Sequence, residues 1–452
     1  MVNTTKSNNS SSAKTGFSPQ ALLQTLSFLP KGANLWVGYS GGCDSHVLLH
    51  ALAAIKKELQ IQLRAVYVNH GLSPHAVAWG EHCLLVCDRL EVPLRILSVD
   101  ATANPGQGPE ASARYARYQA ISGCLNPGDY LCTAHHQDDQ AETLLLQLLR
   151  GAGPKGLAAM PQQSTLGRAK QTRPLLDFTR EQLQTYGEQH GLKWIDDESN
   201  LDTAFDRNFL RHELMPMLQK RWPSAARTLT RSASHCAEAE QLLGELAQQD
   251  YENTKGKTAE TLTIEGLSQL SNIRLKNLLR YWIGLNGLPL PSDIKLQHVV
   301  SDVLPAAQDK APCVTWRGAE VRRFDGMLYI MQAIPQFDSA AVIPWHDLDS
   351  ELVLPDGRRL SFDDDGQSRT PNLSRLKQGK ITIRFRQGGE RITLAGGQHH
   401  KTLKQLFQEK RVPPWQRSRV PLVYKGDSLV AAAGVYCSYG VVICHPANPN
   451  HL

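Results

Sequence analysis

The sequence predicts an α/β protein: a parallel, Rossmann-like sheet in an N-terminal domain, then a helical central domain and a small mixed α/β domain. The first observation is that residues 17–225 alternate short apolar runs with helical patterns, which is typical of parallel sheets covered on both faces. The second is the glycine-containing corner at 40–45, which joins the first apolar run to a helical pattern. The third is the length of 452 residues, which is too great for one core.

Four strand-and-helix pairs make up the predicted sheet. Their strands are 33–40, 63–72, 94–100 and 129–135, and the helices that follow them are 45–59, 79–90, 110–122 and 138–150. Parallel strands end at one edge of the sheet, and ligands of such folds bind there. We therefore expect the segments SGGCDS, NHGL and HHQDDQ, each of which follows a strand, to meet at that edge.

The rest of the chain is organised less regularly. Residues 221–251 read as a long helix, 274–287 as a shorter one, and 314–331 as a hairpin with Asp-Gly at its turn. The predicted divisions are a disordered tail (1–16), a parallel-sheet α/β domain (17–225), a helical domain (226–335), a linker (336–380) and a small basic domain (381–452).

Composition narrows the class of protein. Apolar residues make up 41% and charged residues 20% of the chain, and no apolar run approaches the ~18 residues that span a bilayer. The nine scattered cysteines favour reduced thiols and a cytoplasmic location, whereas the tail lacks the apolar stretch of a signal peptide. The net charge is +6, and residues 381–425 hold ten basic and two acidic residues, which predicts a polyanionic partner.

The corner at residues 40–45 is a candidate phosphate site. A strand that enters a helix through glycines presents unpaired backbone N–H groups, and the helix dipole adds positive charge. Gly41 and Gly42 leave room for phosphate oxygens, Ser40 and Ser45 add hydroxyl donors, and Asp44 suits Mg²⁺. The structural alternative is a tight turn with Asp44 as the helix N-cap.

A second cluster follows the fourth predicted strand. It comprises His135, His136, Asp138, Asp139 and Glu142. The acids suit either a metal ion, with Asp138 as its ligand, or the ammonium group of an amine substrate, and a histidine or carboxylate suits proton transfer. Helix capping by acids is the alternative.

Several segments resemble the tRNA(Ile)-lysidine synthetase family, within the N-type ATP pyrophosphatases (PP-loop proteins). SGGCDS resembles the pyrophosphate loop of the whole superfamily. The segments that resemble the lysidine synthetases themselves are VNHGLS, EASARYARY, TAHHQDDQAETLLLQLLRG, RPLL, WIDDESNLDTAFDRNFLRHELMPML, RFRQGGERI and TLKQLFQEKRVPPWQRSRVPLV. They occur in the expected order over nearly the whole chain beyond residue 17.

The resemblance implies a ligase that uses ATP and Mg²⁺ to join L-lysine to the wobble cytidine of a CAU-anticodon tRNA(Ile), through an adenylated cytidine. It implies that ATP contacts Cys43, His70 and Arg114 as well as the corner, with Arg114 also catalytic. It implies a catalytic role for residues 17–225, substrate or tRNA binding for 226–335 and tRNA binding for 381–452. The tRNA contacts that we expect are Arg207, Arg211, Arg384, Arg386, Lys401, Lys404, Arg411 and Arg417. Alternatives that stay open are tRNA thiolation, a non-catalytic tRNA-binding protein, and a homodimer in place of a monomer.

Overall fold

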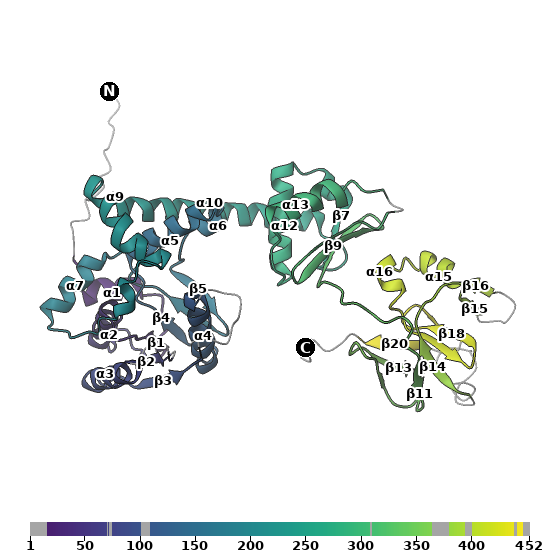
Figure 1. Ribbon diagram of the computed structural model, residues 1–452, viewed down its shortest axis with the longest axis horizontal. Helices are drawn as coiled ribbons and strands as arrows, with labels where there is room; N and C mark the ends of the chain where they lie inside the picture. The colour runs from purple at the N-terminus through teal and green to yellow at the C-terminus, as the bar shows by residue number, and fades with distance from the viewer. Residues whose placement is uncertain are drawn as a thin grey trace, which may run out of the picture. The chain divides into compact units, whose positions relative to one another are not determined.

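The computed structural model describes residues 16–69, 71, 75–100, 109–307, 310–363, 379–393, 400–437 and 441–445. Contacts divide the chain into two units, Met1–Leu243 and Gly244–Leu452, which Figure 1 shows with their elements labelled. His70 and all but the last residue of the expected tail lie outside the described residues.

The first unit is built on the predicted parallel sheet. Its six strands lie in the order β3-β2-β1-β4-β6-β5. Their bounds are β1 Asn34–Gly38, β2 Gln62–Asn69, β3 Leu94–Ser98, β4 Tyr130–Cys132, β5 Gln163–Leu166 and β6 Ala169–Thr172. All pairings are parallel except that of β5, which returns antiparallel to β6. The strand order reverses between β1 and β4, so the ends of these two strands flank the crevice where α/β sheets bind ligands.

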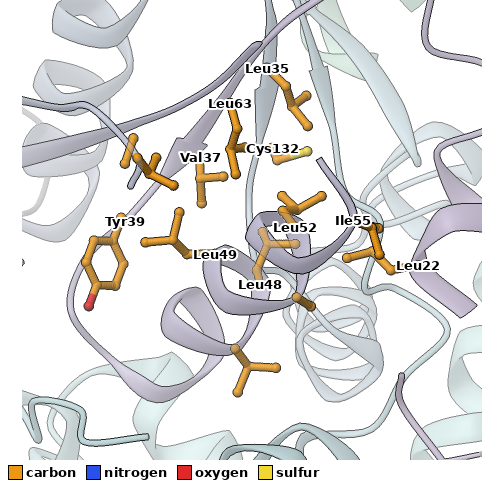
Figure 2. Close-up of a cluster of buried hydrophobic side chains, with 14 of the residues drawn as sticks. Leu22, Leu35, Val37, Tyr39, Leu48, Leu49, Leu52, Ile55, Leu63 and Cys132 are labelled. Atoms are coloured by element: carbon orange, nitrogen blue, oxygen red, sulfur yellow. The ribbon is translucent and has the colours of Figure 1, made fainter. Parts of the chain in front are cut away.

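Helices cover both faces of this sheet. They are α1 Pro19–Thr25, α2 Cys43–Ile55, α3 Ala76–Arg89, α4 Pro109–Cys124, α5 Gln137–Leu149, α6 Pro154–Leu157 and α7 Arg180–Gln189. Leu35 and Val37 pack toward α2, whereas Trp36 packs with the residues of α4, as the two-residue period of a strand requires. Figure 2 shows the core between the sheet and Leu48, Leu49 and Leu52 of α2. This packing fixes the start of α2 at the sheet edge.

A helical segment follows the sheet. It contains η1 Glu198–Leu201, α8 Asp206–Phe209, the π-helix η2 Leu210–Leu214, α9 Met215–Arg221 and α10 Ala225–Thr254. Helix α10 confirms the long helix predicted at 221–251. The division between the two units falls inside α10, and the predicted boundary at residue 225 lies where this helix begins.

The central region contains a sheet as well as the expected helices. Its elements are β7 Thr261–Thr263, α11 Ile264–Ser268, α12 Asn272–Leu285, α13 Asp293–His298, η3 Val299–Val303, β8 Cys313–Trp316, β9 Ala319–Phe324 and β10 Met327–Met331. The strands form one antiparallel sheet in the order β7-β10-β9-β8. The predicted Asp-Gly turn is confirmed, because Asp325 and Gly326 both have positive φ between β9 and β10.

The C-terminal region is rich in strands. Its elements are β11 Ile343–Trp345, β12 Leu352–Val353, β13 Arg359–Asp363, β14 Ile381–Arg384, β15 Arg391–Thr393, β16 His400–Thr402, α15 Leu403–Glu409, α16 Pro414–Arg417, β17 Leu422–Lys425, β18 Ser428–Ala432, β19 Tyr436–Cys437 and β20 Val441–His445. Strand β11 pairs with β14, so part of the segment expected as a linker belongs to the C-terminal sheet. Among the helices of the described residues, none combines the length and the apolar character that crossing a membrane requires.

Candidate active site

A pocket of about 370 Å³ opens at the carboxyl ends of β1, β2 and β4. Its lining comes from the corner after β1, the end of β2, helix α4, the residues after β4, the start of α7 and the loop at 194–200. The predicted site residues among this lining are Ser40, Gly42, Cys43, Asp44, Ser45, Arg114, His135 and Arg211. The expectation that the segments after β1 and β4 meet at one edge is confirmed.

The corner after β1 leaves the start of helix α2 open. Gly42 is the N-cap residue and has no side chain that could accept from the first turn, so the helix start lacks a side-chain cap. Its own N–H donates to Ser40 Oγ at 3.4 Å. Asp44 lies inside the first turn, so the alternative that it serves only as the N-cap is wrong. Ser40 N–H donates to Ser45 Oγ at 3.2 Å, which ties the two ends of the corner together. Uncapped N–H groups at a helix start form an anion site.

Gly41 is required at this corner. Its φ of +84° lies in the left-handed region, and a Cβ there would lie 2.6 Å from Ile195 Cδ1. The backbone of Ile195 also donates its N–H to Gly41 O at 2.9 Å. The loop at 194–197 is therefore fastened to the corner and forms one wall of the pocket.

Asp44 carries an oxygen that suits a cation. Its Oδ1 atom is buried and has no hydrogen-bond partner among the residues described, whereas Oδ2 lies 3.5 Å from His136 Nε2. No group of three or more metal-ligating side chains occurs in the described parts of the chain. Mg²⁺ often takes only one or two carboxylates together with substrate phosphates, so Asp44 fits that mode of binding.

His136 links the two clusters. Its backbone N–H donates to Asp139 Oδ2 at 3.0 Å, and its ring accepts from Asp139 N–H, which together cap helix α5. Burial alone would lower the pKa of His136, but the carboxylates of Asp139 and Asp44 outweigh it and the pKa is raised. The capping alternative is thus partly right: Asp139 caps a helix, and the cap holds a histidine against Asp44.

Two arginines neutralise the acids behind the pocket. Arg207 donates from Nε to Glu142 at 3.0 Å and from Nη2 to Asp139 at 3.1 Å. Arg211 donates to the same two carboxylates at 2.8 and 3.0 Å. Burial would raise the pKa of Asp139, but His136 and Arg207 lower it more. That Arg207 and Arg211 contact tRNA stays a prediction, and the structure shows their guanidinium groups occupied within the protein.

Asp138, the remaining acid of this cluster, accepts a hydrogen bond from a backbone N–H group. Asp138 Oδ2 accepts from Arg180 N–H at 2.9 Å, at the start of α7. Neither Asp138, Asp139 nor Glu142 is among the lining residues of the pocket. Their assignment to a metal ion or to an amine substrate stays a prediction.

His135 differs from its neighbour. Burial lowers its pKa to about 3, although Asp139 acts in the opposite direction, so the ring is neutral at physiological pH. Its Nδ1 atom lies 2.9 Å from Thr133 Oγ1, and the side chain lines the pocket.

Sequence reasoning missed several lining residues. Thr133, Arg180, Trp194 and Ile195 line the pocket, and the loop at 194–197 covers the corner. Thr133 lies inside the strand predicted at 129–135 and follows the shorter observed strand β4, so its place at the sheet edge became clear only from the structure. The other three come from segments that only the fold brings to the sheet edge.

The predicted tRNA-binding cations near the C-terminus lie in the second unit. Arg384 stacks 4.6 Å from the Tyr424 ring, Lys401 pairs with Glu409, and Arg411 pairs with Asp325 at 3.1 Å. Phe407 is fully buried in the core of the C-terminal region. Trp415 is also buried and packs against Tyr329, so it is not an exposed platform for bases.

Comparisons with known proteins agree with this arrangement. A family model for a PP-loop domain matches residues 18–218, a model for the TilS substrate binding domain matches 262–329, and a model for the TilS substrate C-terminal domain matches 381–442. The tRNA(Ile)-lysidine synthase of Coxiella burnetii is 44% identical over 93% of this chain and 93% of its own. Those of Alkalilimnicola ehrlichii and Pectobacterium atrosepticum are 41% and 42% identical, over 92% and 91% of this chain and 93% of each relative.

Proposed function

The chain belongs to the tRNA(Ile)-lysidine synthase family, and we propose that the pocket between β1 and β4 is where its ATP-dependent ligation of lysine to tRNA(Ile) takes place. The observation that carries this proposal is the uncapped start of α2, which opens into that pocket beside a buried, unpartnered oxygen of Asp44.

The corner at 40–45 binds the phosphates of ATP. Backbone N–H groups and the hydroxyl of Ser40 donate to phosphate oxygens, and the helix dipole favours their charge. The hydroxyl of Ser45 donates to Gly42 O at 3.0 Å and so stabilises the corner itself. Asp44 would hold Mg²⁺ on those phosphates, and bound Mg²⁺ would offset their negative charge. Arg114 adds positive charge to the lining of the same pocket.

The reaction that fits has two displacements. In the first, the base carbonyl oxygen of the wobble cytidine bonds to the α-phosphorus of ATP, and the bond from that phosphorus to pyrophosphate breaks. In the second, the lysine ε-amine bonds to the cytidine carbon, the carbon–oxygen bond to AMP breaks, and the amine loses a proton. Both leaving groups carry phosphate, because pyrophosphate leaves in the first step and AMP in the second. The residues that bind phosphate therefore serve both steps.

Free lysine carries positively charged ammonium groups and a carboxylate when it enters this pocket. The acids among the lining residues are Asp44, Asp196 and Asp197. We propose that the loop at 194–197, which is fastened to Gly41, presents acids to the ammonium groups of lysine. The second displacement needs a neutral amine, whose pKa is ordinarily ~10.4, so a carboxylate at this wall is also placed to take the proton.

The pKa of Cys43, the cysteine of the corner at 40–45, disfavours the alternative that the chain catalyses tRNA thiolation. Burial, and then the negative charge of Asp44, raise the pKa of the Cys43 thiol to about 12. A thiol in that state is not a nucleophile at neutral pH. The described cysteines are free thiols, which is consistent with a cytoplasmic location.

The basic surface of the second unit is proposed to bind the tRNA backbone. Arg384, Lys401, Lys404 and Arg411 would neutralise phosphates and so orient the tRNA without reading its sequence. The second unit is also where the two TilS domain models match.

The proposed function is tested by incubating the protein with ATP, labelled lysine and CAU-anticodon tRNA(Ile). We expect label in the tRNA, with AMP and pyrophosphate released in equal amounts. Incorporation without ATP, or a requirement for a sulfur donor, would contradict the proposal, and tRNA binding without turnover would favour a non-catalytic protein. The molar mass of the same sample distinguishes a homodimer from a monomer.

A further inference from the structure

A chain of hydrogen bonds leads from a buried arginine to His135. Arg173 Nη2 lies 2.8 Å from Gln171 Oε1 on strand β6, and Gln171 Nε2 lies 3.1 Å from Thr133 Oγ1. Thr133 Oγ1 in turn lies 2.9 Å from His135 Nδ1. Arg173 and Gln171 are both buried, so water does not compete strongly for these bonds.

These hydrogen bonds from Arg173 to His135 form a relay, and the direction of each one follows from the arginine. A guanidinium group can only donate, so the Gln171 atom that faces Arg173 is the carbonyl oxygen. Ser164 Oγ supports this orientation, because it also contacts Gln171 Oε1, at 3.3 Å. The amide nitrogen of Gln171 must then face Thr133 and donate to its hydroxyl oxygen.

The hydroxyl of Thr133 has a single proton to give. Its oxygen accepts from Gln171, and its other partner among the described residues is His135 Nδ1. If Nδ1 donated to it as well, the buried hydroxyl proton would have no partner there, so the favoured arrangement has Thr133 donating to Nδ1. A neutral imidazole that accepts at Nδ1 carries its proton at Nε2. The Nε2 atom has no hydrogen-bond partner in the described part of the chain, and the side chain lines the pocket.

We propose that Arg173, Gln171 and Thr133 are positioning residues that fix His135 as an Nε2–H donor toward anionic oxygens of the nucleotide. The inference rests on the proposed function, because the corner that would bind the phosphates lines the same pocket as His135. A fixed donor stabilises the charge that develops on phosphate oxygens during displacement at phosphorus.

The same relay excludes one role for His135. A nitrogen that already carries a proton cannot remove one from the lysine amine, and the other nitrogen is occupied by Thr133. The low pKa of His135 agrees with this, because the ring stays neutral and keeps one tautomer at neutral pH. The proton of the amine must therefore pass to another group, such as a carboxylate of the pocket wall.

The tautomer can be read directly from the full-length protein with ¹⁵N-labelled histidine by NMR, with His135→Asn used for assignment. We expect the wild type to show the proton on Nε2. Gln171→Glu should reverse the relay, because a carboxylate at position 171 accepts from both Arg173 and Thr133, so that Thr133 accepts from His135 Nδ1–H. A wild-type proton on Nδ1, or an unchanged tautomer in Gln171→Glu, would overturn the proposal.

A second pair of variants separates the relay from folding. Thr133→Ser keeps the hydroxyl and should keep the Nε2–H tautomer, whereas Thr133→Val removes the hydroxyl and should give a mixture of tautomers. Ser164→Ala is the matched control, since Arg173 still orients Gln171 without it. The same tautomer in Thr133→Val and Thr133→Ser would contradict the relay.

Lysine incorporation gives an independent readout. Gln171→Glu should lower kcat by on the order of 10²-fold at neutral pH, the size of effect expected when one donor to a developing charge is removed. The charged groups that act on His135 are Asp139, Arg173, Arg114 and Arg207, and the variant leaves all four in place.

The tautomer measured by NMR and the rate of lysine incorporation test different parts of the proposal. A wild type that shows the expected tautomer but incorporates no lysine would reject the proposed function and leave the relay standing. A variant whose tautomer is reversed but whose rate is unchanged would show that His135 does not donate to the reacting nucleotide.

Discussion

Arginines in the two units are placed very differently. The side chains of Arg207 and Arg211 at the sheet edge are 21% and 22% exposed, and each binds both Asp139 and Glu142. In the second unit the side chain of Arg411 is 75% exposed and meets a single acid, Asp325. Residue type alone therefore does not say what a cation does in this chain.

Burial accounts for the difference. A buried ion pair is held in one geometry, and the loss of one partner leaves a charge without water or a counter-ion. An exposed pair is screened and contributes little to folding, so its cation remains available to a polyanion. We infer that Arg207 and Arg211 organise the site, whereas an exposed cation such as Arg411 is placed to serve binding.

The largest effect is expected from Asp44→Asn, which tests the sheet edge. Loss of the carboxylate charge should lower the rate of pyrophosphate release by on the order of 10³-fold, because phosphate charge would no longer be offset by a cation held there. Binding of tRNA should be largely intact. The matched control is Asp88→Asn on the exposed side of α3, and equal turnover in both variants would remove Asp44 from the mechanism.

Glu142→Gln should have the largest effect on stability. The change removes the charge that Arg207 and Arg211 share, and breaking a buried pair costs about 3–5 kcal/mol. Denaturant titration of the wild type and the variant measures the difference. Glu213→Gln, on the exposed side of the same helical segment, should change the free energy of unfolding by less than about 0.5 kcal/mol. Similar losses in both variants would contradict the comparison.

The exposed cations should be visible in the salt dependence of tRNA binding. Lys404→Gln together with Arg411→Gln should reduce the slope of log affinity against log salt by about 0.7–0.9 for each phosphate that is no longer neutralised. The same pair of changes at Lys31 and Lys57, on the first unit, should leave the slope closer to that of the wild type. An unchanged slope in the first pair would refute the proposed tRNA surface.

Deleting residues 381–452 is a poorer test than these substitutions. Strand β14 pairs with both β11 and β17, and Trp345 shares a core with Ile381 and Ile383. A deletion would expose that core, so weaker tRNA binding would follow from misfolding as well as from the removal of charge.

The smallest expected effect is a change in how the free energy of unfolding depends on pH. The pKa of Asp139 is lower in the folded protein than its ordinary value of about 4, so its contribution to stability is present above that value and is lost as the pH falls further. Asp139→Asn should therefore make the free energy of unfolding less dependent on pH in the acidic range. A pH dependence identical to that of the wild type would show that Asp139 is not stabilised by its partners.

Much of the fold and part of the site were predictable from the sequence. Apolar periodicity identified the strands and helices of the sheet, and parallel pairing brings Ser40 and His135 to one edge. The asymmetry of charge along the chain was also readable. The partners of Arg207 and Arg211 were not, because the residues they bind lie 65–72 positions away and no local pattern encodes such pairings.

Two further features of the structure could not be predicted from local sequence patterns. The short strands β11 and β12 lie in a loop-rich segment and form only by pairing with β14 and β13, so propensity gives little signal for them. The relay from Arg173 to His135 joins β6 to the end of β4, and its direction depends on a side chain that the sequence does not place near the site.

The most direct test of the account is a crystal structure of the protein with a non-hydrolysable ATP analogue. We predict that its outer phosphates lie against the backbone N–H groups between Gly42 and Ser45, within reach of Asp44 Oδ1. Nucleotide bound in a different cavity, with the start of α2 left open, would contradict the central claim.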